Sequence, residues 1–298
     1  MKKSISLVLG SGGARGYAHI GIIEVLEDYG YEIKSIAGSS MGALIGGLYA
    51  CGKLDAYKEW VLTLDVLDVL KLLDFTIGKI GFIKGDRIFS IMEEMIGEKN
   101  IEDLPISFTA VATDLTTQKE VWLQKGILSV AVRASIAIPT IFTPIELKNK
   151  ILIDGGILNP VPIGPTLSDM TDLTVAVNLN SSITIKHQII IPEKENKRQH
   201  ILHDKINTFL EQKLPGKEEP GLNYTKIFRK TIDAMQHAIT RYKMAGYQPD
   251  VVIEIPSNAC GFYEFHKAYE MIEIGKKIAK ETLENLKYLT QHRNSKGG

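Results

Sequence analysis

The chain is predicted to be an α/β protein built on parallel strands, and three observations predict this. Residues 4–37 show the order strand, glycine loop, helix, strand, which is a βαβ unit. Further apolar runs bounded by turn residues alternate with segments of helical spacing along the rest of the chain. One apolar run also leads into a Gly-x-Ser-x-Gly turn, from which a helix-like stretch of small and apolar residues leaves.

Composition and length indicate the number of domains and the class of protein. The 298 residues suffice for one large domain, and 44% hydrophobic with 23% charged residues is typical of a globular protein with a sizeable core. We expect a single domain over 1–298. The 35 basic and 35 acidic residues cancel, so no strong global field would attract nucleic acid.

Two features predict the compartment. Cys51 and Cys260 lie far apart in the sequence, which gives no sign of a disulfide framework or a cysteine-rich zinc site. The apolar run at residues 5–9 is too short for a signal peptide, and no stretch reaches the length of a membrane span. We therefore expect a cytoplasmic protein, with contact to one side of a membrane left open.

The elements follow in order. The βαβ unit consists of a strand over 4–9, a helix over 17–29 and a strand over 33–37. Further strands are expected at 108–113, 120–123, 173–179 and 250–255, with a hairpin at 145–154. Further helices are expected at 87–96, 128–138, 225–243 and 262–289, with one or two helices over 54–75. Residues 186–220 are predicted to be a charged surface excursion, and residues 290–298 a polar tail.

The turn Gly38-Ser39-Ser40-Met41-Gly42 has the sequence form of a nucleophile elbow. Gly38 and Gly42 lack side chains, so a strand and a helix can approach closely around Ser40. The alternative is a glycine-rich packing turn with a solvated serine.

The glycine loop at residues 10–16 has two interpretations. Arg15 and Ser11 stand where a dinucleotide-binding G-x-G-x-x-G would need glycine, so nucleotide binding is disfavoured. The other use is an oxyanion hole, with backbone N–H groups of Gly12 and Gly13 as donors and Met41 as the second source.

Asp154 ends an apolar run and is followed by Gly155 and Gly156. Catalytic carboxylates are often placed at such strand ends. An aspartate also commonly caps a turn, and the spacing leaves both interpretations open.

Taken together, these motifs resemble the patatin-like phospholipases, especially the small bacterial members. The matching stretches are GSGGARGYAHIG at 10–21, GSSMG at 38–42, ATDL at 112–115, AVRASIAIP at 131–139, DGG at 154–156 and NPVP at 159–162. They run in family order within a core of about residues 5–166, and the pieces around 249–256 and 265–275 are also similar. The motif positions are Gly10, Ser11, Gly12, Gly13, Ala14, Arg15, Gly16, Gly38, Ser39, Ser40, Gly42, Asp154, Gly155 and Gly156.

The resemblance implies a three-layer α/β/α sandwich with a largely parallel central sheet. It also implies a Ser–Asp dyad, with Ser40 as nucleophile, Asp154 as general base and the glycine loop as oxyanion hole, cleaving lipid acyl esters without a metal or other cofactor. Ser11 departs from the glycine that many members carry, which would matter little if its backbone N–H is a donor. The role of Arg15 stays open between ordering the loop and contacting a lipid phosphate.

Alternatives remain at the level of mechanism and function. A Ser-Asp-His triad would need a histidine after Asp154, and the candidates by order are His187, His200, His203, His237, His266 and His292. His19 precedes the nucleophile and is more typical of a packed histidine than of a base. A non-enzymatic scaffold that retains the fold is the alternative function. No His, Asp or Glu grouping has metal-ligand spacing.

The apolar segment after the Ser40 helix is a candidate acyl-chain wall. Trp60, Leu64, Leu67, Leu70 and Phe75 exceed the apolar stripe of an ordinary surface helix, and glycines at 78, 81 and 85 could let the segment move. An ordinary buried helix is the competing interpretation. Head group, acyl length and oligomeric state are not predicted.

Overall fold

The computed structural model describes residues 2–72, 86–139, 142–182 and 224–294. In these ranges the chain forms one eight-stranded sheet of order β5-β6-β3-β2-β1-β7-β8, with β4 paired to β3 beside this path. The strands are β1 (Lys3–Leu9), β2 (Tyr31–Ser39), β3 (Ser107–Asp114), β4 (Lys119–Leu123), β5 (Ile145–Leu147), β6 (Lys150–Asp154), β7 (Leu173–Ser181) and β8 (Val251–Pro256).

The sheet is mixed, with a parallel body and an antiparallel margin. The strands β3-β2-β1-β7-β8 run parallel to one another, whereas β4, β5 and β6 join as antiparallel neighbours. Parallel neighbours need long crossover connections, which bring helices onto the faces of the sheet.

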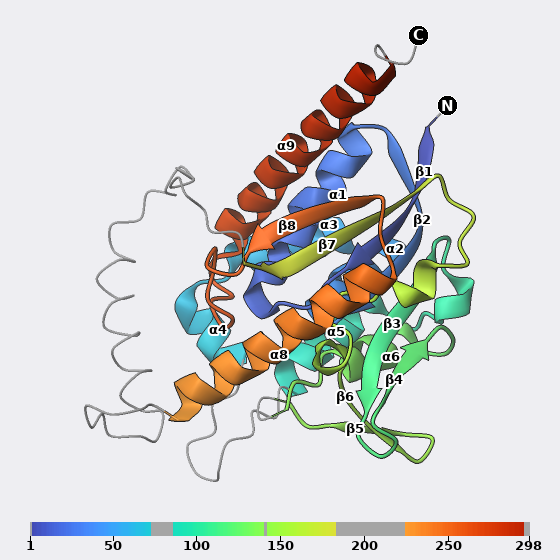
Figure 1. Ribbon diagram of the computed structural model, residues 1–298. Coiled ribbons are helices and arrows are strands. Elements are labelled where there is room, and N and C mark those ends of the chain that lie inside the picture. Colours follow the sequence, from blue (N-terminus) through green and yellow to red (C-terminus); the bar gives the residue numbers. More distant parts are fainter. Residues whose placement is uncertain (1, 73–85, 140–141, 183–223, 295–298) are drawn as a thin grey trace.

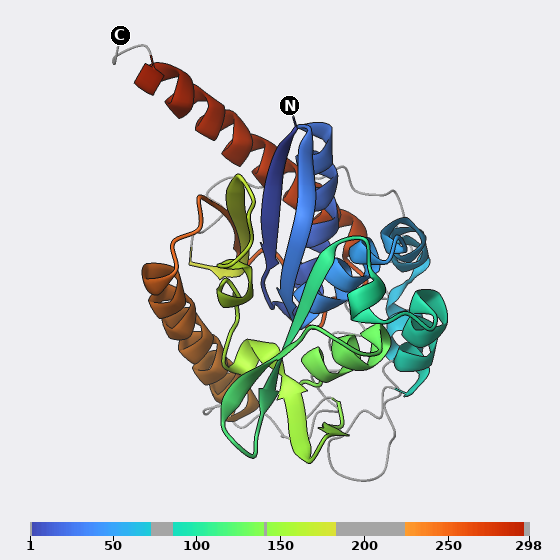
Figure 2. The same cartoon turned by 90° about the vertical axis from the view of Figure 1, so that its right-hand side faces the viewer.

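Helices cover both faces (Figure 1). Helix α8 (Tyr224–Gly246) lies on one face, and α1 (Ala18–Asp28), α2 (Met41–Ala50) and α9 (Ala268–Asn294) lie on the other, as the turned view in Figure 2 makes plain. Around α2 are α3 (Leu54–Thr63), α4 (Val66–Leu72), α5 (Asp86–Ile96) and α6 (Leu128–Ser135). The predicted three-layer α/β/α sandwich is therefore confirmed.

The buried strand β1 explains the apolar run at the start of the sequence. Its side chains alternate between faces, as the pleat of a strand requires. Ile5, Leu7 and Leu9 join the main core under α1, α2 and α9. Val8 points to the other face, into a smaller cluster with Val161, Ile163 and Ala176, against which Met244 of α8 packs.

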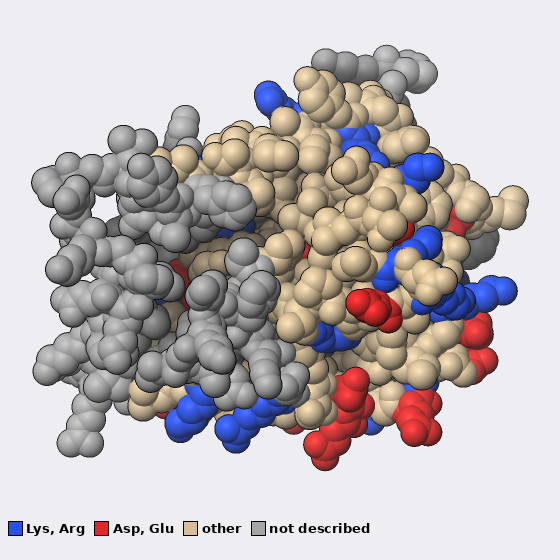
Figure 3. Space-filling view, turned by 90° about the horizontal axis from the view of Figure 1, so that it is seen from below, with Lys and Arg blue, Asp and Glu red and all other residues tan. Residues whose placement is uncertain are grey.

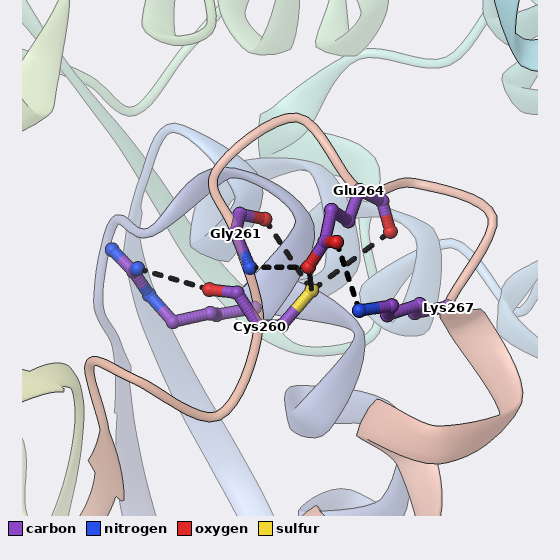
Figure 4. A network of polar contacts seen from close by, with 5 residues as sticks. Cys260, Gly261, Glu264 and Lys267 are labelled. Carbon is purple, nitrogen blue, oxygen red and sulfur yellow. Dashed lines mark hydrogen bonds and ion pairs between the residues drawn. The ribbon is translucent and has the colours of Figure 1, made fainter. Parts of the chain in front are cut away.

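The last expected helix was wrong at its start. Residues 262–289 were expected to be helical, yet α9 begins at Ala268 and continues to Asn294, so it also takes in most of the expected tail. Glu264 explains the late start, because its Oε2 accepts the N–H of Gly261 at 2.7 Å and its Oε1 pairs with Lys267 at 2.8 Å. Figure 4 shows this turn, which also contains Cys260.

Two further predictions concern segments that the structure describes only in part or not at all. The apolar segment after α2 forms two helices, α3 and α4, and its continuation over 73–85 lies outside the described residues. The predicted excursion at 186–220 also lies outside them.

The surface fits the neutral composition. Seen from below, basic and acidic side chains lie next to one another over the right-hand half of the molecule, so neither sign dominates there (Figure 3). Among the helices of the described ranges, none is long and apolar enough to cross a lipid bilayer.

Candidate active site

Ser40 lies on a sharp turn between β2, which ends at Ser39, and α2, which begins at Met41. Its backbone has φ 54° and ψ −124°, a region that a side-chain-bearing residue rarely adopts. The turn is crowded, because a Cβ on Gly42 would lie 2.0 Å from the carbonyl oxygen of Leu9. Glycine at position 42 is therefore a requirement for strand β1 and helix α2 to approach.

The two adjacent serines have different surroundings. The Ser39 hydroxyl donates to the carbonyl oxygen of Asn159 at 2.7 Å, so it is committed to an internal contact. The Ser40 backbone N–H donates to Ser135 Oγ at 3.0 Å, and the side chain of Ser40 remains for other partners. Both serines are buried.

Strand register brings Asp154 to Ser40. Strand β4 pairs with residues 110–114 along one edge of β3. The other edge of β3 is shared, since β2 pairs with residues 107–111 and β6 with residues 112–114. Ser39 therefore lies opposite Val111 and Asp154 opposite Ala112, at the point where β2 leaves the edge and β6 takes over.

The carboxyl group of Asp154 is buried and, within the part of the chain that the structure describes, has no ion-pair partner to keep it charged. Burial raises its pKa to about 7, while hydrogen bonding from the Ser40 hydroxyl and the Gly156 N–H acts in the opposite direction. Oδ1 accepts the Gly156 N–H at 2.7 Å, so Asp154 does cap its turn. Oδ2 is buried and has no close hydrogen-bond partner among the described residues. Hydrogen bonds of catalytic groups are often long before substrate binds.

The glycine loop lies beside this pair, and its N–H groups divide into two sets. Those of Gly10, Ser11 and Ala14 donate to carbonyl oxygens of Val177, Pro160 and Phe262 at 3.1, 2.8 and 2.9 Å. Those of Gly12 and Gly13 donate to no acceptor within the described ranges. The backbone N–H of Ser11 is therefore already committed to Pro160, so the condition under which its departure from glycine would matter little is not met.

The loop also packs against the start of α2. A Cβ on Gly16 would lie 2.4 Å from Cβ of Met41, so the two backbones are in close contact. The N–H of Met41 is in the first turn of α2, where amides have no partner within the helix. The glycine loop is thus in contact with the start of α2, and the oxyanion role of Gly12, Gly13 and Met41 stays a prediction.

Comparison with known proteins identifies the family of this chain. The family model described as patatin-like phospholipase matches residues 7–167, more than half of the chain. An uncharacterised NTE family protein of Mycobacterium tuberculosis is 37% identical over 94% of this chain and 91% of its own length. The chain belongs to the patatin-like phospholipase family.

Other patatin-like proteins are more distant. A patatin-like phospholipase domain-containing protein of Caenorhabditis elegans is 35% identical over 53% of this chain and 12% of its own length. The crystal structure of VipD from Legionella pneumophila aligns with a TM-score of 0.52 and 15% identity, covering 94% of this chain and 67% of VipD. The VipD likeness bears on the fold alone. Family membership supports an esterase- or lipase-type hydrolase that acts on lipids.

Arg15 of the patatin-like glycine loop points into the protein. Its guanidinium donates to the carbonyl oxygens of Ser257 and Cys260 at 3.0 and 3.3 Å, and to Asn180 Oδ1 at 2.7 Å. The side chain is buried. These contacts tie the loop to the ends of β7 and β8, and they favour the ordering role over contact with a phosphate.

The histidines have other roles in the described chain. His19 is fully buried, and its Nε2–H donates to the carbonyl oxygen of Gly10 at 2.9 Å. Burial lowers the pKa of His19 to about 4, so it is neutral at physiological pH. His237 lies on α8 beside a hollow lined also by Asp233 and Arg241. Among the histidines of the described ranges, none contributes to the pKa of Asp154.

The remaining histidines of the triad alternative give no support for it. His187, His200 and His203 lie outside the described residues, as does the side chain of His292. His266 lies in the turn before α9, near Glu264. Within the described ranges, no group of three or more His, Cys, Asp and Glu side chains could hold a metal ion.

The candidate acyl-chain wall is only partly described. Trp60 and Leu64 are half-buried against the main core, and Leu67 is 42% exposed. Phe75 and the glycines at 78, 81 and 85 lie outside the described residues, and so does the side chain of Leu70. The acyl-chain interpretation stays a prediction.

Sequence reasoning missed the polar side chains that support the two turns. Asn159 Nδ2 donates to Glu120, which pairs with Lys243 of α8 at 3.2 Å. Gln236 of α8 donates to the carbonyl oxygen of Gly156 at 3.0 Å. Ser135 lies inside a quoted family stretch but was given no role. These partners are far apart in sequence, so no local pattern could have paired them.

Proposed function

We propose that the protein is a serine hydrolase that cleaves lipid acyl esters of the phospholipase or lysophospholipase type. Ser40 is the nucleophile on a nucleophile elbow, and Asp154 is its general base. The N–H groups of Gly12, Gly13 and Met41 form the oxyanion hole. The substrate is a lipid or acyl ester taken from a membrane surface or from solution, and the setting is the cytoplasm.

The observation that carries this proposal is the environment of Asp154. An ordinary aspartate, with a pKa of about 3.9, is a weak base at neutral pH. Burial of Asp154 beside the Ser40 hydroxyl raises its pKa to about 7, close to the pH at which a general base works best. A carboxylate that only capped a turn would gain nothing from being buried next to a serine hydroxyl.

The reaction then has two halves. Asp154 takes the proton of the Ser40 hydroxyl as Oγ forms a bond to the ester carbonyl carbon, and the carbonyl oxygen becomes an oxyanion held by the N–H donors. The intermediate collapses, the C–O bond to the alcohol breaks, and Asp154 returns the proton to the leaving oxygen. Water attacks the acyl-enzyme with Asp154 as base again, releasing the fatty acid and restoring Ser40.

The scheme favours esters and thioesters over amides. An amide needs a strong acid to protonate its leaving nitrogen, and this site offers a single buried carboxyl group for that step. Apart from water, the proposed reaction uses only side chains and backbone groups of this chain, so it requires no cofactor.

The test compares Ser40→Ala with Ser39→Ala. Both remove one buried hydroxyl from neighbouring positions, so differences in folding are matched. Ser40→Ala should abolish hydrolysis of acyl esters and labelling by a fluorophosphonate probe, whereas Ser39→Ala should keep most of both. Normal turnover by Ser40→Ala would disprove the proposal. A wild-type protein that neither labels nor hydrolyses any ester of a chain-length panel would instead support the scaffold alternative.

A further inference from the structure

We propose that the last residue of α6 and the turn that follows it, residues 135–137, form a brace that holds Ser40 and Asp154 at their working separation, with Ser135 as a positioning residue. The inference rests on the proposed Ser40–Asp154 dyad. Ser135 itself touches no reacting atom and acts through the backbone of Ser40.

The Ser135 hydroxyl has a fixed hydrogen-bond polarity. Its Oγ lies 2.6 Å from the carbonyl oxygen of Val111, which can only accept, so the hydroxyl proton is committed there. The lone pairs of the same oxygen then accept the N–H of Ser40 at 3.0 Å. Ser135 is fully buried, so no water competes for either bond.

The same turn also holds the base. The carbonyl oxygen of Ala137, two residues beyond Ser135, accepts the backbone N–H of Asp154 at 2.9 Å. The turn itself is tied back to α6, because the N–H groups of Ile136 and Ala137 donate to carbonyl oxygens of Val132 and Ala134. One short segment, anchored on its helix, thus contacts the backbones of both dyad residues.

The brace matters most at Ser40, where the backbone is strained. A φ of 54° persists in a side-chain-bearing residue only when its surroundings hold it. The bond from the Ser40 N–H fixes the peptide that enters the turn and so the direction of the hydroxyl. Displacement of a reacting group by about 1 Å can lower the rate by about 100-fold.

The experiment removes the Ser135 hydroxyl. We expect Ser135→Ala to lower kcat on a soluble acyl ester by about 100-fold. KM should stay within about twofold, because binding precedes the misplaced step. The rate of fluorophosphonate labelling should fall in parallel, and the pH midpoint of activity should not move, because Asp154 is intact.

Ser6→Ala is the matched control. Ser6 lies on β1, away from the proposed site; it is also fully buried, and its hydroxyl donates to Asp169 at 2.9 Å. Both variants lose a hydrogen-bonded hydroxyl, so we expect similar losses of thermal stability. Only Ser135→Ala should lose kcat. If Ser135→Ala does not fold, Ser135→Cys takes its place. The thiol is of similar size but is a weaker hydrogen-bond acceptor, so we expect kcat to fall in the same way but by a smaller factor.

The outcomes separate this inference from the function it rests on. An active Ser40→Ala would overturn the dyad itself. An inactive Ser40→Ala together with a Ser135→Ala of unchanged kcat would overturn the brace alone. A fall in kcat that Ser6→Ala shares equally would reduce Ser135 to a contributor to stability, and it would also overturn the proposal.

Discussion

The turns that carry Ser40 and Asp154 hold their side chains by different means. The Ser40 turn joins an interior parallel strand to a helix, and backbone crowding and strain define it. The Asp154 turn follows an antiparallel strand at the margin of the sheet, and its own carboxyl group caps it. Backbone geometry thus defines the position of the proposed nucleophile, whereas burial defines the environment of the proposed base. Each turn should fail in its own way when it is changed.

The largest effect we expect comes from removing the charge of Asp154 and keeping its shape. Asp154→Asn can still accept the Gly156 N–H, so the turn should survive, but it cannot take a proton. General-base catalysis contributes up to about 10⁴-fold, and we expect a loss of that order in kcat/KM. Steady-state hydrolysis of a soluble ester by the folded variant measures it. A loss below about tenfold would mean that Asp154 only caps the turn.

The pH dependence of the wild-type protein is the next largest effect. Activity needs ionised Asp154, so below its pKa of about 7 the rate should fall about tenfold per pH unit. The rate should level off above that pH. A profile of kcat/KM between pH 5 and pH 9 measures the midpoint. A profile that stays flat down to pH 5 would put the pKa near its ordinary value of about 3.9 and show that burial does not raise it.

Stability should run in the opposite direction to activity. The pKa of Asp154 is raised in the folded state, so the folded protein holds this proton more tightly than the unfolded chain does. Its contribution to the free energy of unfolding is complete below the unfolded pKa of about 3.9 and is lost as pH rises through about 7. Chemical denaturation across this range should show that loss in the wild-type protein and not in Asp154→Asn.

The same contrast explains what the sequence could predict. The Ser40 turn is local, so five residues with their flanking strand and helix sufficed to predict its position. Asp154 lies 114 residues further on (154 − 40), and what joins the two is the shared edge of β3, which pairs with Ser39 and Asp154 in succession. No local sequence pattern encodes this strand register. The spacing therefore could not decide whether Asp154 is a catalytic base or the cap of its turn.

The wrong start of the last helix has a local physical cause. Residues 262–267 carry apolar spacing compatible with a helix, but Glu264 binds the backbone of Gly261 and closes a turn there instead. The side chain thus competes with the helix for backbone hydrogen bonds. The partner of the Ser11 N–H is set by the tertiary fold instead, because Pro160 comes close to it only in the folded chain.

A smaller effect concerns α4, the second helix after the α2 helix of the Ser40 turn. Leu67 is 42% exposed, so Leu67→Gln should fold normally. If this segment lines the acyl chain, kcat/KM on long-chain esters should fall about fivefold, which corresponds to about 1 kcal/mol of lost apolar contact. Butyryl esters should be unaffected. The matched control is Leu289→Gln, an exposed leucine near the end of α9. Equal losses on both chain lengths would remove α4 from the substrate site.

The smallest effect on activity should come from substituting His19, which lies in α1 and contacts the glycine loop through the carbonyl oxygen of Gly10. In His19→Gln the amide group can still donate to the carbonyl oxygen of Gly10, which is the bond that Nε2 makes now. A buried histidine with a pKa of about 4 is not in the acid–base cycle of this scheme. Activity should therefore change by less than about threefold, far below the contribution of a general base. His237→Gln, on the opposite face of the sheet, should behave likewise. A folded histidine variant that lost as much as Asp154→Asn would replace the dyad with a triad, because the proton would then have to pass through imidazole.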